Sequence, residues 1–199
     1  MTFEEESKRQ ADLALWINEH HAHPFQGDAR QQLAFAAFDL ALEHHAAICS
    51  LGVGGLFGSL FALLRILFEA YGRGLWLRHV ASDADVQHFF SEDEPPLKFG
   101  QLLASVEKQL GIQVGPLTTL KSNHWQMFCS FAHTGYQALY RRMSATHTGP
   151  VNYTDEELVA ALQAAGAFAI LAAVELASMY GDAALVKATQ EKAREYAVQ

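Results

Sequence analysis

The segment from Leu56 to Ala81 carries large apolar side chains at most of its positions, and it constrains the fold more than any other part of the chain. At 100° per residue, these side chains cover nearly the whole circumference of an α-helix. A helix that is apolar on all sides must be surrounded by other elements. We therefore expect residues 56–81 to form the central helix of the molecule.

Helical periodicity dominates the rest of the chain, and strand-like alternation is weak throughout. We therefore predict an all-α fold, an antiparallel bundle of about seven to nine helices. A chain of 199 residues fits one domain with its own core. Within the single domain 1–199 we expect residues 28–143 and 154–180 to form the bundle core, and 183–199 to form a peripheral C-terminal helix.

Turn residues and capping patterns give the approximate bounds of these helices. The spacing Thr-x-x-Glu at Thr2 and at Thr154 predicts two capping boxes, and Pro116 is a favourable first helical residue. Thr134-Gly135 is expected to break the helix that Pro116 begins. The predicted helices span about residues 2–19, 28–50, 56–81, 82–91, 99–110, 116–133, 154–180 and 183–197, with a further helical stretch ending near 142.

Composition and charge limit the classes of function. Half of the residues are apolar and 18% are charged, which is typical of a globular domain. The formal net charge of −8 argues against a general DNA or RNA coat protein, because such binding depends on lysine and arginine at phosphates. Cys49 and Cys129 lie in apolar helical sequence, so we interpret them as buried, reduced residues of a cytoplasmic protein. The acidic start of the chain does not resemble a signal peptide.

One segment has nearly the length of a membrane span. Residues 46–64 contain no formal charge, and a spanning helix needs about 20 mostly apolar residues. However, Gly52-Val53-Gly54-Gly55 is typical of a turn. We therefore expect two helix ends in the core here, and no membrane partner.

The central helix carries one charged stripe. Arg65, Glu69 and Arg73 follow one another at intervals of four residues, so they lie close to one line along the helix. Unpaired buried charges are costly, so something polar must meet this stripe. One interpretation is a structural Arg-Glu-Arg ladder in a noncatalytic interaction protein. The other is the wall of a cleft in which two arginines bind a phosphate or carboxylate, because guanidinium groups bind such groups in a bidentate manner.

A second group of polar and aromatic residues belongs to the helix that begins at Pro116. Lys121, His124 and Trp125 lie on roughly one face of that helix, and Tyr136 follows the expected break. His133 comes nine residues after His124, about half a turn away around the helix. The two histidines can share a site only if the helix ends near His133 and the chain is redirected there. The alternative is that each histidine is an ordinary hydrogen-bonded residue.

Ten histidines raise the question of a metal site. The sequence contains neither Glu-x-x-His nor His-Glu-x-x-His, and it has no Cys-x-x-Cys. We therefore expect no metal and no cofactor. A His-ligated bundle enzyme that uses, for example, His44, His124 and His133 is retained as a second alternative.

The spacing Arg65-x-x-x-Glu69-x-x-x-Arg73-x-x-Trp76-Leu77, followed by Lys121-x-x-x-Trp125 and His133-Thr-Gly135, resembles that of uncharacterised bacterial helical proteins related to the HEPN superfamily. The resemblance covers about residues 28–143. It implies an antiparallel bundle that forms a homodimer. It also implies either a metal-independent ribonuclease of the toxin type or a noncatalytic protein.

The ribonuclease members of that superfamily carry an arginine and a later histidine with four to six residues between them. Here Arg73-x5-His79, Arg141-x5-His147 and Arg142-x4-His147 fit this spacing, although Gly74 stands where the family has a polar residue. The resemblance implies that Arg73 would stabilise the charge of the phosphorane, while His133 or His79 would handle the proton. Arg65, Glu69, Lys121, His124, Trp125 and Tyr136 are the candidate residues for binding a nucleotide or RNA.

Overall fold

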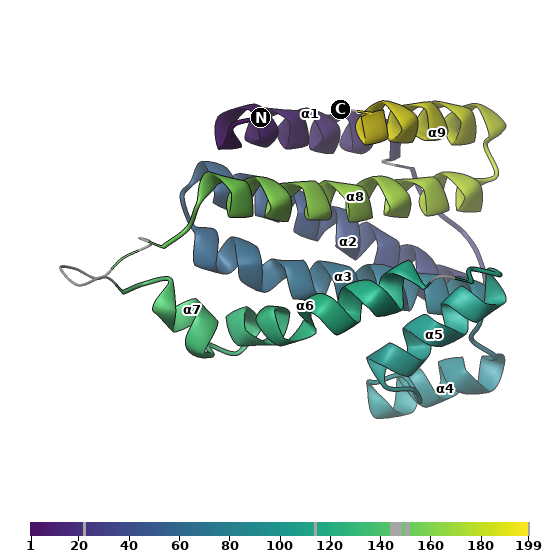
Figure 1. Ribbon diagram of the computed structural model, residues 1–199. Helices are drawn as coiled ribbons and strands as arrows, with labels where there is room; N and C mark the ends of the chain where they lie inside the picture. Colours follow the sequence, from purple (N-terminus) through teal and green to yellow (C-terminus); the bar gives the residue numbers. More distant parts are fainter. Residues whose placement is uncertain (22, 114, 144–148, 150–151, 199) are drawn as a thin grey trace.

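The computed structural model describes residues 1–199 except 22, 114, 144–148, 150–151 and 199, and in the described residues it contains nine α-helices and no strand (Figure 1). The predicted all-α class is therefore confirmed. The helices are α1 (Phe3–His21), α2 (Ala29–Val53), α3 (Phe57–His79), α4 (Asp83–Glu92), α5 (Phe99–Gln109), α6 (Pro116–Ala132), α7 (Tyr136–Tyr140), α8 (Asp155–Tyr180) and α9 (Ala183–Val198).

Side-chain caps explain where several helices begin. Thr154 accepts a hydrogen bond from the Glu157 amide at 3.3 Å, and the Glu157 carboxylate accepts one from the Thr154 amide at 3.1 Å. Thr2 and Glu5 form the same reciprocal pair at the start of α1. Each pair satisfies amide groups that a helix leaves without partners, so both predicted capping boxes are confirmed.

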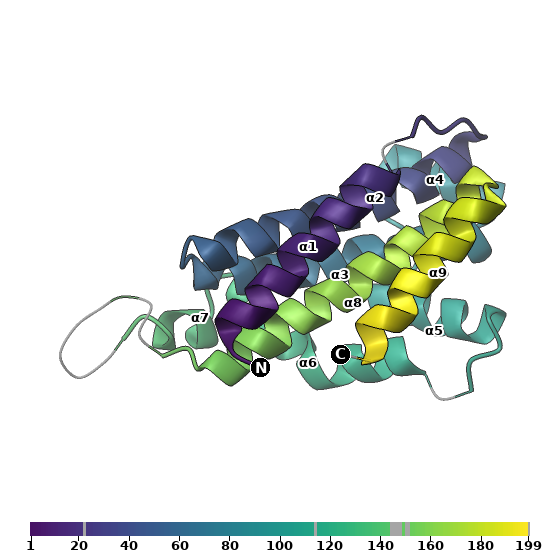
Figure 2. The ribbon, with the colours of Figure 1, turned by 90° about the horizontal axis from the view of Figure 1, so that it is seen from above.

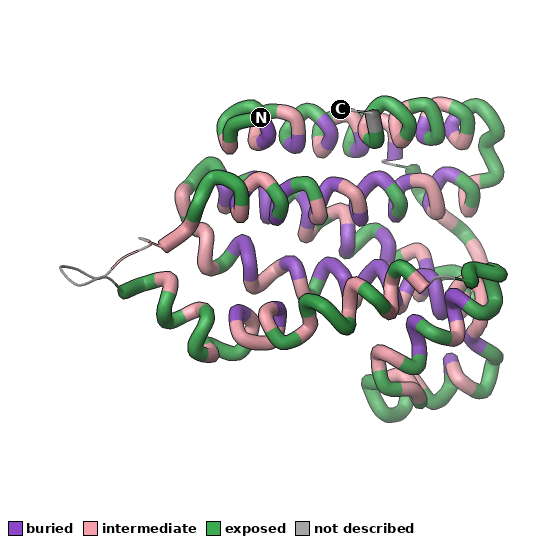
Figure 3. Tube along the Cα trace, viewed as in Figure 1, coloured by how far each residue is buried: buried purple, intermediate pink, exposed green. Residues whose placement is uncertain are grey.

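Helix α3 lies inside the bundle, where it packs against α2, α5, α6 and α8. Figure 1 shows α1 and α9 above α8, and α6 below α3, while α4 and α5 cover one end. Seen from above, α8 lies beneath and between α1 and α9 (Figure 2). Buried residues are concentrated on α2, α3 and α8 (Figure 3), as expected for the helices around one core.

The enclosure of α3 is incomplete, which corrects the expectation of a helix buried on all sides. Leu60, Leu67 and Trp76 are fully buried in the core. Ile66, in contrast, is 42% exposed, and the side chains of Arg65, Glu69 and Arg73 retain partial exposure. One strip of α3 therefore reaches the surface, and it carries the charged stripe.

The uncharged segment 46–64 is not one long helix. Helix α2 ends at Val53, Gly54 caps it, Gly55 has φ +67°, and α3 begins at Phe57. Among the described residues, α8 is the one helix long and apolar enough to cross a membrane, by length and composition alone. Just over half of its most apolar stretch, 56%, is buried inside the bundle, so the same pattern fits a core helix.

The break at Thr134-Gly135 is present, as predicted. Helix α6 ends at Ala132, His133 follows as its cap, and Thr134 takes the left-handed conformation with φ +56°. The short helix α7 then begins at Tyr136 in a new direction, as Figure 1 shows. This redirection determines where His133 lies.

Candidate functional site

Arg65, Glu69 and Arg73 form a ladder of ion pairs on the exposed strip of α3. Arg65 Nε donates to Glu69 Oε1 at 3.0 Å, and Arg73 Nη1 donates to Glu69 Oε2 at 3.3 Å. The side chains are 20%, 15% and 36% exposed, from Arg65 to Arg73. The single carboxylate is therefore shared, and both arginines keep further N–H groups for other partners.

Trp125 joins this ladder to α6. The guanidinium carbon of Arg65 lies 4.8 Å from the centroid of the Trp125 ring, and the ammonium nitrogen of Lys121 lies at the same distance. Phe99 of α5 stacks on Trp125 with 5.4 Å between the ring centroids. The indole ring is thus held by an aromatic neighbour and approached by cations from two helices.

His133 contacts the guanidinium group of Arg65. Its Nε2 atom is in hydrogen-bond contact with Arg65 Nη1. A guanidinium group has no acceptor, so Nε2 is the accepting atom in this contact. The end of α6 therefore places an exposed histidine beside an arginine that is 68 residues away in sequence.

Other candidate residues lie apart from these contacts. His124 is exposed on α6, where its ring lies 6.1 Å from that of Phe128. Tyr136 is 75% exposed and stacks on Tyr140 with 5.8 Å between the centroids. His79 faces α8, because its Nε2 lies 3.1 Å from Glu175 Oε2. His147 of the other Arg-x-His spacings lies outside the described residues.

The structure does not bring His44, His124 and His133 together. Among the described residues there is no group of three or more histidine, cysteine, aspartate or glutamate side chains that could hold a metal ion. His44 belongs to α2, while the other two lie on α6 and at its end. The three-histidine alternative therefore has no support in the geometry.

The buried residue Glu107 positions α6, and the sequence analysis did not single it out. Its carboxylate on α5 accepts hydrogen bonds from the amides of Leu117 and Thr118, at 2.6 and 3.0 Å, and from the Thr118 hydroxyl at 2.8 Å. A carboxylate at a helix N-terminus satisfies unpaired amides and interacts favourably with the helix dipole. Glu107 thereby fixes the first turn of the helix that carries Lys121 and Trp125.

Arg73 also borders an apolar groove of about 380 Å³ between α2, α3 and α4. Its walls include Leu40, Ile66 and Phe89, and Asp93 stands at the same groove. The Arg73 end of the ladder therefore has a second carboxylate nearby. The strongest excess of positive charge lies at the other end, around Arg65 and Lys121.

The fold and the site define an all-α bundle with a half-buried surface of cations and aromatic rings between α3 and α6. Residues 38–199 match the model of a family of unknown function, DUF6988, and the chain belongs to that family. No curated protein and no solved structure matches the chain. The family match includes no assignment to the HEPN superfamily, so that resemblance remains a proposal.

Proposed function

We propose that the surface between α3 and α6 binds a phosphate-bearing ligand, either a nucleotide or RNA. Two contacts carry this proposal: Arg65 and Arg73 share one carboxylate, Glu69, and Arg65 and Lys121 both lie against the ring of Trp125. Arg65 and Lys121 leave a local excess of positive charge at this end of the ladder, on a chain whose formal net charge is −8. An anion bound there would receive charge-assisted hydrogen bonds from groups that are already positioned.

The contacts suggest how the ligand would be bound. Glu69 and Trp125 hold the Arg65 side chain from two sides, so little conformational freedom is lost when a phosphate binds to it. Tyr136 offers an exposed ring just beyond His133, on which a nucleobase could stack. The exposed His124 and the half-buried Lys121 would contact the ligand from α6.

A ribonuclease activity is the finer form of this proposal, and it rests on the HEPN-like resemblance. In it, Arg73 would stabilise the negative charge of the phosphorane and His133 would transfer the proton, without a metal ion. His133 is favoured over His79 as the proton-transfer group, since His79 is held by Glu175 on another side of α3. The same resemblance supports a homodimer, and the free thiols of Cys49 and Cys129 favour a cytoplasmic location.

A titration tests the binding proposal. AMP and a short 5′-phosphorylated RNA are titrated into the protein by isothermal titration calorimetry at low salt. We expect Arg65→Met and Lys121→Met each to weaken binding about tenfold, which is typical of one hydrogen bond to a charged group. Arg78→Met is the matched control, because Arg78 is paired with Glu175 away from this surface.

The outcomes separate the proposals. Equal loss in all three variants, or no binding of either ligand, would contradict the anion site. Cleavage of RNA in the presence of EDTA, abolished by His133→Gln and by Arg73→Ala without unfolding, would support the ribonuclease. Binding without cleavage would leave a noncatalytic ligand-binding bundle.

A structural role is the second candidate, and the shared pairing of both arginines with Glu69 favours it. In that case the ladder joins α3 to α6 in an interaction protein with no ligand at this surface. The Arg65, Arg73 and Lys121 variants would then lower the melting temperature and change no binding isotherm.

A further inference from the structure

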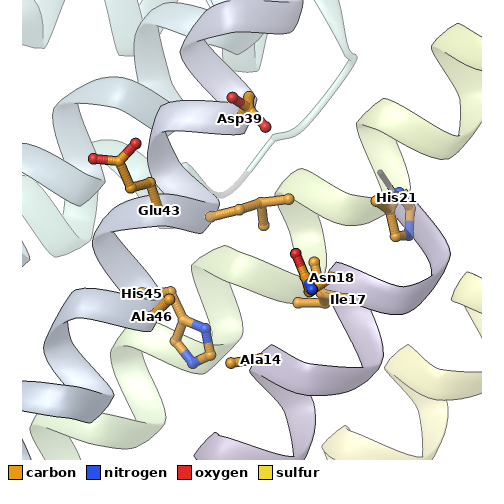
Figure 4. A pocket seen from close by; sticks show the side chains of 9 residues that line it. Ala14, Ile17, Asn18, His21, Asp39, Glu43, His45 and Ala46 are labelled. Atoms are coloured by element: carbon orange, nitrogen blue, oxygen red, sulfur yellow. The ribbon is translucent and has the colours of Figure 1, made fainter. Parts of the chain in front are cut away.

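A second pocket lies on the other side of the bundle, between α1 and α2 (Figure 4). Its volume is about 370 Å³, which is within the range of small-molecule sites. Apolar walls are formed by side chains such as Ile17 and Leu42. The polar residues that line it are Asn18, His21, Asp39, Glu43 and His45.

The His45 imidazole forms part of the floor and is 1% exposed. Figure 4 shows its ring extending from α2 toward Ala14 of α1. Nε2 lies 2.9 Å from Gln10 Oε1. The Gln10 amide nitrogen donates to Glu6 Oε1 and to the Tyr196 hydroxyl, so its orientation is fixed and Oε1 must be the acceptor facing His45.

His45 therefore carries its proton on Nε2, which leaves Nδ1 as a hydrogen-bond acceptor. Burial lowers the pKa of His45 to about 4, which keeps the ring neutral at physiological pH. Within the described residues, Nδ1 of His45 has no hydrogen-bond partner.

His21 repeats this arrangement on α1. Its Nε2 lies 3.2 Å from Thr189 Oγ1, and the Thr189 hydroxyl donates to the Leu185 carbonyl at 2.8 Å. The hydroxyl proton is thus used, so Thr189 accepts from Nε2–H, and Nδ1 of His21 is again an acceptor. In the described part of the chain the Nδ1 atom of His21 is buried and has no partner, and such an acceptor is costly unless a donor reaches it.

The two charged side chains that line the pocket are both acidic. Asp39 and Glu43 are one helical turn apart on α2, and neither forms an ion pair with a described residue. Burial and the neighbouring Glu43 raise the pKa of Asp39. Like charges at this spacing destabilise a helix, and a bound cation would relieve the repulsion.

We propose that the α1–α2 pocket is a binding site for an alkylammonium group. The neutral histidines supply acceptors, the carboxylates supply negative charge, and the apolar walls accommodate the alkyl part. An ammonium group is both the hydrogen-bond donor and the cation that this lining lacks. Such a group could belong to a free amine or to a lysine side chain of another protein, and the site recognises the chemistry common to both.

The probe for the test is butylammonium chloride, titrated at neutral pH and followed by calorimetry and by NMR of the ¹⁵N-labelled histidines. We expect saturable binding, with the Nδ1 resonance of His45 shifting as it accepts a hydrogen bond. Asp39→Asn should weaken the binding about tenfold, since it removes a charged partner. Glu94→Gln, which removes one charge in the exposed loop after α4, is the matched control and should leave the binding unchanged.

Two further probes make the test specific. 1-Butanol has the same alkyl chain without the charge, and tetramethylammonium has the charge without N–H donors; neither should bind. Equal binding of either compound, or an unshifted His45 resonance at saturation, would overturn the proposal. Nα-acetyl-lysine N-methylamide then separates the sources: binding similar to butylammonium indicates a lysine side chain, and butylammonium alone indicates a free amine.

Discussion

The guanidinium group of Arg65 lies over the ring of Trp125, 4.8 Å from its centroid, and this contact joins α3 to α6. Lys121 approaches the same ring at an equal distance. Two cations beside one indole repel each other, and a purely structural contact would not need the second one. This accumulation of positive charge is the main reason to expect an anion at the surface.

Glu69→Gln provides a sharp test, because binding and structural roles predict different results. The change removes the carboxylate that competes with an external anion for Arg65 and Arg73. We expect AMP to bind several-fold more tightly, while the free energy of unfolding falls by about 1 kcal/mol or less, since solvent screens these partly exposed pairs. Calorimetric titration and urea denaturation measure the two effects.

Glu175→Gln is the control for that prediction. Glu175 also pairs with an arginine and a histidine of α3, namely Arg78 and His79, but on the side that faces α8. A comparable loss of stability with unchanged AMP affinity is expected. If Glu69→Gln weakened AMP binding, or if both variants changed it equally, the anion site would have to be abandoned.

The sequence was sufficient to predict the helices because their signals are local. Thr154 and Glu157 cap α8 through atoms three residues apart, and Gly181 ends it with φ +72°. The position of α3 at the centre also followed from its own composition. Its exposed strip did not, because exposure at Ile66 depends on which helices leave that face uncovered.

The parts of the candidate site were predictable, but their assembly was not. The pairing of Arg65 with Glu69, and of Lys121 with Trp125, follows from a spacing of four residues. The contact between these pairs depends on how α6 packs on α3, which no local pattern encodes. His45 shows the same limit, because its partner Gln10 lies on another helix and is itself oriented by Tyr196 of α9.

The stability of the protein should decrease on mild acidification. Burial lowers the pKa of His45 from 6.5 to about 4, so the unfolded chain binds more protons than the folded chain between these values. The contribution of His45 is therefore complete above about pH 6.5 and is lost as the pH falls toward 4. Over that window it amounts to about 3 kcal/mol. Urea denaturation at pH 7, 6, 5 and 4 measures the loss.

His45→Gln isolates this effect, because glutamine can still donate to Gln10 and does not titrate. The free energy of unfolding should then depend clearly less steeply on pH. Part of this dependence should persist through His21, whose pKa is also lowered by burial. His124→Gln, the same substitution at an exposed position, is the control for the change of residue itself. An identical slope in wild type and His45→Gln would show that this buried ring is not responsible.

Two glycines of α3 should respond in opposite directions to alanine. A Cβ atom at Gly74 would lie 2.7 Å from ring carbons of the buried Phe38, whereas one at Gly58 would lie 3.6 Å from the Tyr153 hydroxyl. Gly74→Ala must displace a packed ring and should destabilise the protein by about 1–3 kcal/mol. Gly58→Ala should be neutral or stabilising by up to about 1 kcal/mol, because alanine favours the helix. Thermal denaturation of both variants distinguishes steric crowding from helix propensity.

Glu107 should influence the α3–α6 surface without touching it, because its carboxylate holds the first turn of α6. Glu107→Ala leaves two amides and a hydroxyl without their acceptor in a buried position, so a loss of about 2–3 kcal/mol is expected. Hydrogen exchange of the Leu117 and Thr118 amides should then become faster, and the affinity of the protein for AMP should decrease as well. Glu107→Gln retains one acceptor oxygen and should show a smaller change in all three measurements. If Glu107→Ala quickened exchange in α6 but left AMP affinity intact, Lys121 and Trp125 would not depend on this cap for their binding geometry.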